Sequence, residues 1–184
     1  MLLDRPVAGG LTLYPPRAMT PAGRPAEEFY LLRADAELDR AIDIRVAEPD
    51  GSLRRTWLAE YVAAQMNGLL RLAPGWDGHR ARAIADDAVS SAANLILAVA
   101  DDLTIPPQLF PLVDGGIQFE WHAGPDTVEI EIDPAGRAYG FVSGPDGSAL
   151  DDAINDHDEG ELAVVRDAVR RLSSRAAGAD ASTS

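Results

Sequence analysis

The chain has 184 residues, of which 46% are apolar, a composition typical of one modest folded domain. Its 16 basic residues are all arginine and face 30 acidic residues, so the net charge of −14 argues against a sequence-independent nucleic-acid binder or an anionic-membrane protein. The absence of cysteine excludes disulfides, thiolate metal sites and cysteine nucleophiles. No apolar run approaches the ~18 residues of a membrane span, and residues 1–5 are not a basic stretch that leads into a hydrophobic signal, so we expect a cytoplasmic protein without membrane contact.

Proline and glycine are concentrated in residues 1–28, where they interrupt helices and strands, so this segment is expected to be an extended arm. Residues 29–33 and 42–46 alternate apolar and polar side chains as strands do, whereas residues 34–40 between them have a helical composition. We expect a single domain over residues 29–175 and a disordered tail over residues 176–184.

Three amphipathic helices are predicted. In the first, apolar residues recur at three- and four-residue spacing over 58–70, and the helix ends before Pro74. The second begins near Asp86, whose carboxylate is expected to cap the free amides, and it ends before residues 105–107. The third begins at Asp158, where Glu161 completes a capping-box pattern.

Residues 117–133 have the most regular strand pattern, with a turn at residues 123–126. Their apolar members define one buried face: Ile117, Phe119, Trp121, Val128, Ile130 and Ile132. A strand over 137–142 and an edge strand over 108–111 extend this hairpin to a meander of three or four strands, whereas residues 151–159 are expected to form a solvated loop. Helices with one apolar stripe and a sheet with one apolar face predict an α+β two-layer sandwich.

Three motifs give the chain a resemblance to a group of small bacterial and phage proteins of unassigned function. They are residues 70–78 (Leu-Arg-Leu-Ala-Pro-Gly-Trp-Asp-Gly), 105–111 (Ile-Pro-Pro-Gln-Leu-Phe-Pro) and 114–121 (Asp-Gly-Gly-Ile-Gln-Phe-Glu-Trp), followed by alternating acids over 128–132. The resemblance spans roughly residues 57–142 and departs at Gly75, where the group usually has asparagine. It implies a shared fold and assigns no activity.

Acidic residues are concentrated in residues 114–160, where twelve of them face only Arg137, so this segment carries −11 of the total charge. Strand alternation places five polar side chains on one face of the hairpin: Glu120, His122, Glu129, Glu131 and Asp133. Like charges facing each other across strands cost stability, which favours a basic partner for Glu120, Glu129, Glu131 and Asp133.

Two other interpretations of this face stay open. Carboxylates with a histidine in reach are ligands for Mg²⁺ or Mn²⁺, which would place a metal at Glu120, His122, Glu129 and Glu131 and a divalent-metal hydrolase or nuclease around it. Alternatively, the face is the solvated side of a half-buried sheet, as binary patterning requires. No lysine is present to act as a general base or a phosphate clamp.

The loop around Trp76 and Asp77 is a second candidate site. An aromatic side chain flanked by polar groups is typical of a partner-binding anchor. The alternative is structural, with Trp76 covering the core between two helices, Asp77 accepting backbone hydrogen bonds and Gly78 adopting a positive φ.

The sequence contains no nucleophile elbow, phosphate-binding glycine loop, zinc-protease motif or dinucleotide fingerprint, so we predict no catalytic residues and no cofactor. The leading hypothesis is a non-enzymatic, inhibitor- or antitoxin-like module that binds a basic protein, such as the product of a neighbouring gene. Nucleic acid and membranes are not expected partners.

Overall fold

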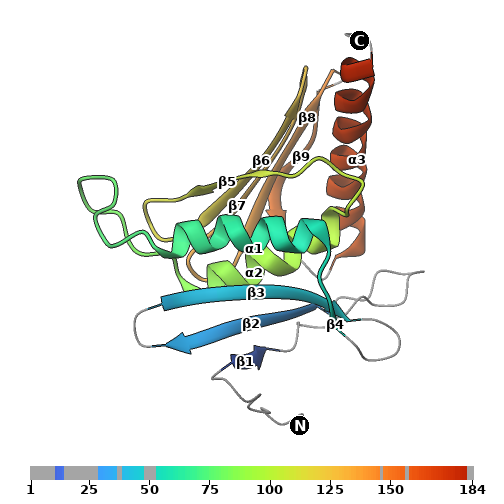
Figure 1. Ribbon diagram of the computed structural model, residues 1–184. Coiled ribbons are helices and arrows are strands. Elements are labelled where there is room, and N and C mark those ends of the chain that lie inside the picture. Colours follow the sequence, from blue (N-terminus) through green and yellow to red (C-terminus); the bar gives the residue numbers. More distant parts are fainter. Residues whose placement is uncertain are drawn as a thin grey trace.

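The computed structural model describes residues 11–14, 29–36, 39–47, 53–145, 147–155 and 158–181. The predicted α+β class is confirmed, because three helices pack on a five-stranded antiparallel meander (Figure 1). In chain order the elements are β1 (Leu11–Tyr14), β2 (Phe29–Ala36), β3 (Asp39–Ala47), β4 (Leu53–Arg54), α1 (Trp57–Leu70), α2 (Asp86–Val99), β5 (Gln108–Pro111), β6 (Ile117–Ala123), β7 (Asp126–Ile132), β8 (Ala138–Gly144), β9 (Gly147–Ile154) and α3 (Glu159–Ala181).

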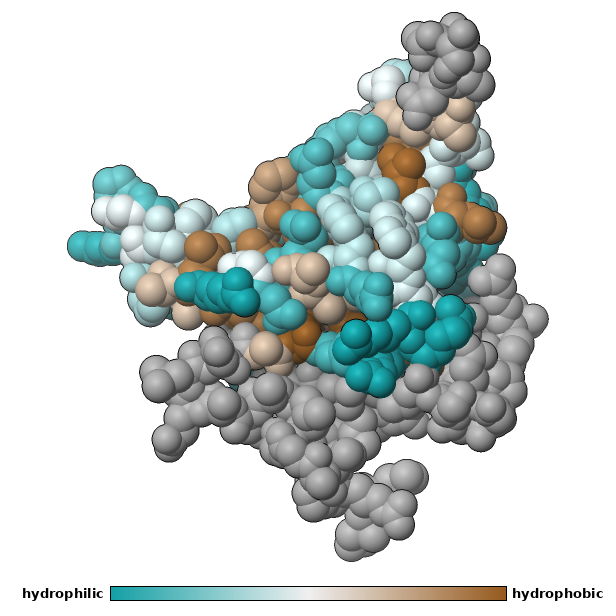
Figure 2. All heavy atoms as spheres, in the orientation of Figure 1, coloured by the Kyte–Doolittle hydropathy of each residue, from teal (hydrophilic) through white to brown (hydrophobic). Residues whose placement is uncertain are grey.

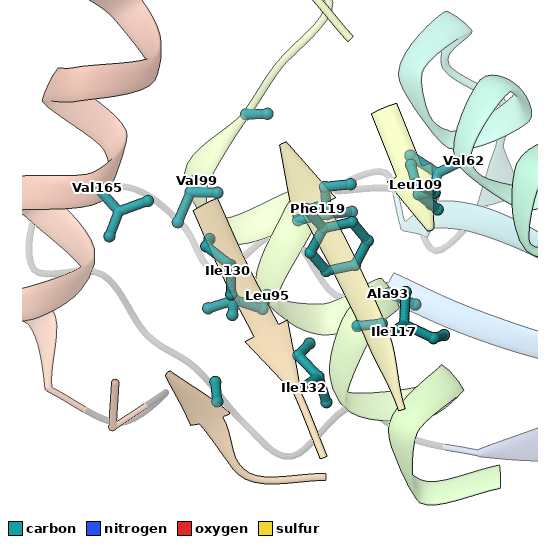
Figure 3. Close-up of a cluster of buried hydrophobic side chains, with 14 of the residues drawn as sticks. Val62, Ala93, Leu95, Val99, Leu109, Ile117, Phe119, Ile130, Ile132 and Val165 are labelled. Atoms are coloured by element: carbon teal, nitrogen blue, oxygen red, sulfur yellow. The ribbon is translucent and has the colours of Figure 1, made fainter. Parts of the chain in front are cut away.

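The five-stranded sheet follows chain order, β5-β6-β7-β8-β9, with every neighbouring pair antiparallel. The predicted hairpin and its register are confirmed, with Phe119 opposite Ile130 and Glu120 opposite Glu129. The predicted apolar face is at most 1% exposed: Ile117, Phe119, Trp121, Val128, Ile130 and Ile132. Figure 3 shows Phe119 and Ile130 side by side on their strands, with side chains from α2 and α3 directed at them. This face is the core that the helices cover.

Residues 147–154 form a fifth strand, β9, where the sequence predicted a loop from residue 151. The strand pairs along β8, and its Leu150 and Ile154 pack over Gly140, where a Cβ atom would collide with the Ile154 side chain. Consecutive acids at Asp151 and Asp152 break the alternation on which the prediction depended. Residues 156–157 of the expected loop lie outside the described residues.

The helix ends confirm some of the predicted caps. The Asp158 Oδ1 atom accepts hydrogen bonds from the backbone N–H groups of Gly160 and Glu161, as an N-cap residue does. The carboxylate of Glu161, however, accepts from the N–H of Asn155 instead of completing the box at Asp158. Capping by Asp86 is wrong, because α2 starts at Asp86 itself and the N-cap position is Ala85, which makes no side-chain cap.

Helix α3 extends through Ala181, beyond the residue 175 boundary expected from the sequence. Alanine has the highest intrinsic helix propensity, and residues 176–181 are mostly alanine. The helix is fixed to the sheet near this end by Arg175, whose Nη1 atom forms an ion pair with Asp126 Oδ2 at 2.9 Å. The Ser173 hydroxyl accepts a hydrogen bond from the N–H of Ile105, and the Ile105 carbonyl accepts one from the indole N–H of Trp121.

A second antiparallel sheet, β1-β2-β3-β4, lies on the other side of α1 and α2 (Figure 1). The two strands predicted over residues 29–33 and 42–46 are confirmed as β2 and β3. They pair as far as Ala36 and Asp39, and so include residues 34–36 and 39–40 of the segment of helical composition. The Asn67 side chain of α1 accepts a hydrogen bond from the N–H of Ile42 and donates one to its carbonyl. The expected arm over residues 1–28 lies mostly outside the described residues, but Leu11–Tyr14 within it form β1.

Candidate functional site

The face of the five-stranded sheet opposite the helices, here called the outer face, carries the predicted acidic residues. Strand alternation places on it two adjacent cross-strand rows. One row is Phe110, Gln118, Glu131 and Tyr139, and the other is Gln108, Glu120, Glu129, Phe141 and Asp151. Every one of these side chains is exposed or half-buried, whereas their neighbours along β6, β7 and β8 are buried. Neither row includes an arginine.

Glu120 is the most constrained carboxylate on the outer face. Its Oε1 atom accepts a hydrogen bond from the Gln118 amide at 2.9 Å, and its Oε2 atom lies 3.1 Å from His122 Nε2. The other ring nitrogen of His122 lies 3.2 Å from the Thr127 hydroxyl. Both oxygens of Glu120 therefore have partners within the sheet.

Glu129 and Glu131 differ from Glu120, because their side chains form no hydrogen bond or ion pair with any residue that the structure describes. Each lies directly opposite an aromatic residue of β8, with Phe141 facing Glu129 and Tyr139 facing Glu131. Tyr139 is 47% exposed. A guanidinium group that stacks on such a ring can simultaneously reach the adjacent carboxylate.

Sequence reasoning did not place the aromatic residues on this face. The alternation in β8 puts Tyr139 and Phe141 on the same side of the sheet as the acids, but the strand pattern over residues 137–142 did not indicate a binding role for either ring. Phe110 on β5 is likewise 39% exposed at the end of its row. The exposed rings make the outer face amphipathic as well as acidic.

Asp133 differs from the other predicted acids, because its carboxylate already has partners within the chain. Strand β7 ends at Ile132, and Asp133 closes the following turn. Its Oδ1 atom accepts from the N–H groups of Ala135 and Arg137, and its Oδ2 atom forms an ion pair with the Arg137 guanidinium. These hydrogen bonds, chiefly those from Arg137, hold the pKa of Asp133 below its ordinary value, so this carboxylate is stabilised rather than repelled.

The predicted metal ligands are not gathered. Among the residues that the structure describes, no group of three or more histidine or acidic side chains is arranged to hold a metal ion. The geometry of the strands explains this, because residues two apart on one face of a strand are separated by about 7 Å. Glu129 and Glu131 are such a pair, and the residue opposite Glu131 is the amide Gln118.

The loop of Trp76 and Asp77 projects from the body of the molecule between α1 and α2 (Figure 1). Its Asp77 Oδ1 atom accepts from the N–H groups of His79 and Ala81, which holds the pKa of Asp77 below its ordinary value. Gly78 has a φ of +79°, as the structural interpretation predicted. Asp77 is therefore the residue that shapes the loop.

Trp76 does not cover the core between the helices, so that expectation is wrong. It is half-buried but is not among the residues packed against the hydrophobic core. The loop closes on itself through a hydrogen bond from the N–H of Gly75 to the carbonyl of Ala81, which keeps Trp76 with the loop. Its indole Nε1 atom is buried and has no hydrogen-bond partner within the described structure.

Comparison of the chain with family models, with curated proteins and with solved structures finds no match. The resemblance to the bacterial and phage group therefore stays a prediction. Within the described residues, no helix combines the length and the apolar character that crossing a membrane requires.

Proposed function

We propose that the chain is a binding module whose outer face takes an arginine-bearing segment of a basic protein. The observation that carries this proposal is that Glu129 and Glu131, which have no partner in the described structure, lie opposite the half-buried Phe141 and the exposed Tyr139. A guanidinium is planar, stacks on aromatic rings and binds carboxylates through two N–H groups, whereas an ammonium is a strongly hydrated point charge. The face is therefore better suited to arginine than to lysine.

An inhibitor- or antitoxin-like role fits this chemistry, because a rigid acidic sheet can cover a basic surface without rearranging. The sheet is rigid at this position, since the outer face and the packed core are opposite sides of the same strands. Binding of this kind needs neither a cofactor nor a reacting group from the chain.

The test is a titration of the protein with a fluorescent peptide that carries arginine at alternate positions, beside an otherwise identical lysine peptide. We expect the arginine peptide to bind more tightly. The double variant Glu129→Gln/Glu131→Gln should bind it about five- to thirtyfold more weakly, as expected from about 1–2 kcal/mol for two partly exposed ion pairs.

A charge-matched control separates the outer face from the general acidity of the chain. Asp167 is exposed on α3, so Asp167→Asn removes one negative charge away from the sheet, as Glu131→Gln does on it. The control should change the affinity less than twofold. Equal losses in Asp167→Asn and Glu131→Gln, or no binding to the wild-type protein, would overturn the proposal.

A further inference from the structure

The loop that joins α1 to α2 is basic, although the chain as a whole is strongly acidic. We call residues 71–82 the basic loop, because Arg71, His79, Arg80 and Arg82 are all exposed on it. Its one acid, Asp77, is occupied by the backbone hydrogen bonds described above. Figure 2 shows hydrophilic atoms, in teal, at the tip of this projection on the left of the molecule.

The guanidinium groups of the basic loop differ from most others in the described structure, because they form no ion pair or hydrogen bond there. Ion pairs with carboxylates of the same chain are formed by Arg45, Arg55, Arg137, Arg166, Arg170 and Arg175. The loop therefore presents positive charge that the fold leaves unused.

The basic loop is held in place by its backbone. The N–H of Gly75 donates to the carbonyl of Ala81 at 2.7 Å, and the N–H of Arg82 donates to the carbonyl of Val113 at 2.9 Å. Gly115, with φ of +98°, approaches the same segment so closely that a Cβ atom would lie 2.7 Å from the Ala83 carbonyl oxygen. A loop held in this way loses little conformational entropy when it binds.

The chain thus carries two unsatisfied surfaces of opposite charge. The outer face has Glu129 and Glu131 beside aromatic rings, and the basic loop has only arginine and histidine as its cations. No ion pair joins the two surfaces within the described part of the chain. The outer face offers carboxylates and the basic loop offers guanidinium groups, so each surface is complementary to the other. A second copy of the chain can therefore supply the partner of both.

We propose that two copies associate reciprocally, with the basic loop of each seated on the outer face of the other. This rests on the arginine-binding outer face proposed above, and the basic loop of the second copy takes the place there of the arginine-bearing segment of a basic protein. In such a contact, each copy offers the same two surfaces to the other, so a twofold axis relates the copies and the assembly stops at a dimer. Both basic loops and both outer faces are then in contact. Arg80 and Arg82 supply the guanidinium groups, and Glu129 and Glu131 receive them.

The effect of salt on the dissociation constant of the dimer distinguishes contact through ion pairs from contact through apolar patches. Two chains of net charge −14 repel each other as a whole, so only close contact between oppositely charged patches brings them together. Salt screens the long-range repulsion first, so we expect the ion-paired dimer to weaken with added salt only above about 0.15 M, where the range of the repulsion is already about 8 Å. A dimer joined through apolar patches would instead be unchanged or strengthened by salt.

The experiment is sedimentation equilibrium of the full chain over a range of protein and salt concentrations. We expect a dimer with a micromolar dissociation constant at about 0.15 M salt that weakens as more salt is added. The loop reversal Arg80→Glu/Arg82→Glu and the face reversal Glu129→Arg/Glu131→Arg should each weaken self-association more than tenfold. Arg171→Glu, which reverses an exposed arginine on α3, is the matched control and should leave it unchanged.

Mixing the two reversed proteins supplies the decisive result. Each alone places like charges in contact, but an equimolar mixture restores both complementary contacts and should form a heterodimer. Circular dichroism of each variant establishes that it is folded, so the mixture tests the contact and not stability. Failure of the folded variants to form the heterodimer would overturn the reciprocal contact.

Three other outcomes also overturn this inference. A wild-type protein that stays monomeric while binding the arginine peptide through Glu129 and Glu131 would refute the second copy and leave the proposed function intact. A dimer insensitive to both reversals would place the interface elsewhere. Binding of a labelled single-stranded oligonucleotide that is lost in Arg80→Glu/Arg82→Glu would reassign the basic loop to a polyanion.

Discussion

Replacing Ile130 by alanine tests the central claim about which side of the sheet is the core. Ile130 is fully buried on the middle strand β7, opposite Phe119 on one neighbouring strand and Gly140 on the other. Removing its side chain beyond Cβ costs about 2.4 kcal/mol at about 0.8 kcal/mol per buried methylene. A residual cavity of about 50 Å³ adds about 1.2 kcal/mol, so we expect a total loss between about 2 and 5 kcal/mol.

The assay is urea unfolding followed by far-ultraviolet circular dichroism, with Ile130→Ala compared with Glu129→Ala. Glu129 precedes Ile130 on the same strand but points to the outer face and forms no hydrogen bond in the described structure. Its replacement should therefore change the free energy of unfolding by less than about 0.5 kcal/mol. A loss below about 0.5 kcal/mol for Ile130→Ala, or the larger loss for Glu129→Ala, would show that the two faces are exchanged.

Three further substitutions test the turn, the second sheet and the base of the loop. Hydrogen bonds and the ion pair with Arg137 lower the pKa of Asp133. The carboxylate therefore stabilises the protein above the unfolded pKa of about 3.9, and this stabilisation is lost as the pH falls through the lower folded pKa. Asp133→Asn should lower the melting temperature at pH 7, and the melting temperature of this variant should fall less steeply between about pH 5 and pH 3. An unchanged pH profile would contradict this. Asn67→Ala should cost about 1–3 kcal/mol in urea unfolding because it leaves backbone groups of β3 unpaired, whereas the exposed Gln65→Ala on the same helix should cost less than about 0.5 kcal/mol. Gly115→Ala should cost more than about 1 kcal/mol because of its positive φ and close contact, whereas Gly68→Ala, in open space on α1, should stabilise the protein by about 0.5–1 kcal/mol; equal effects would refute the strain at Gly115.

The sequence alone predicts those helices and strands in which the spacing of apolar residues matches the side that is buried. Strand alternation over residues 117–132 predicted the buried face residue by residue, because every second side chain there is large and apolar. It did not reveal that Asp133, just beyond the strand, is already paired with Arg137. Alternation continues past the last paired residue, and only the turn contacts of Arg137 show that the strand has ended.

The remaining differences arise from tertiary contacts that local pattern does not encode. Strand β9 has two consecutive acidic residues, which are typical of a loop, but packing of Leu150 and Ile154 on Gly140 stabilises it as a strand. Tyr139 lies opposite Glu131 because of the register in which β8 pairs with β7. The pattern within one strand does not predict which residues of a neighbouring strand lie opposite it. Arg80 has no partner among the residues that the structure describes, and composition alone does not predict which arginines remain unpaired.

The amide of Asn67 has a consequence for how the second sheet meets other molecules. Strand β4 pairs with β3 only at Val46 and Ala47, which would leave the N–H and C=O of Ile42 on an unprotected strand edge. Such an edge is a template onto which a foreign strand can add and from which fibrils grow. Because Asn67 accepts from the N–H of Ile42 and donates to its carbonyl, a helix side chain takes the place of the missing strand at Ile42, and a foreign strand cannot pair at that residue without displacing it.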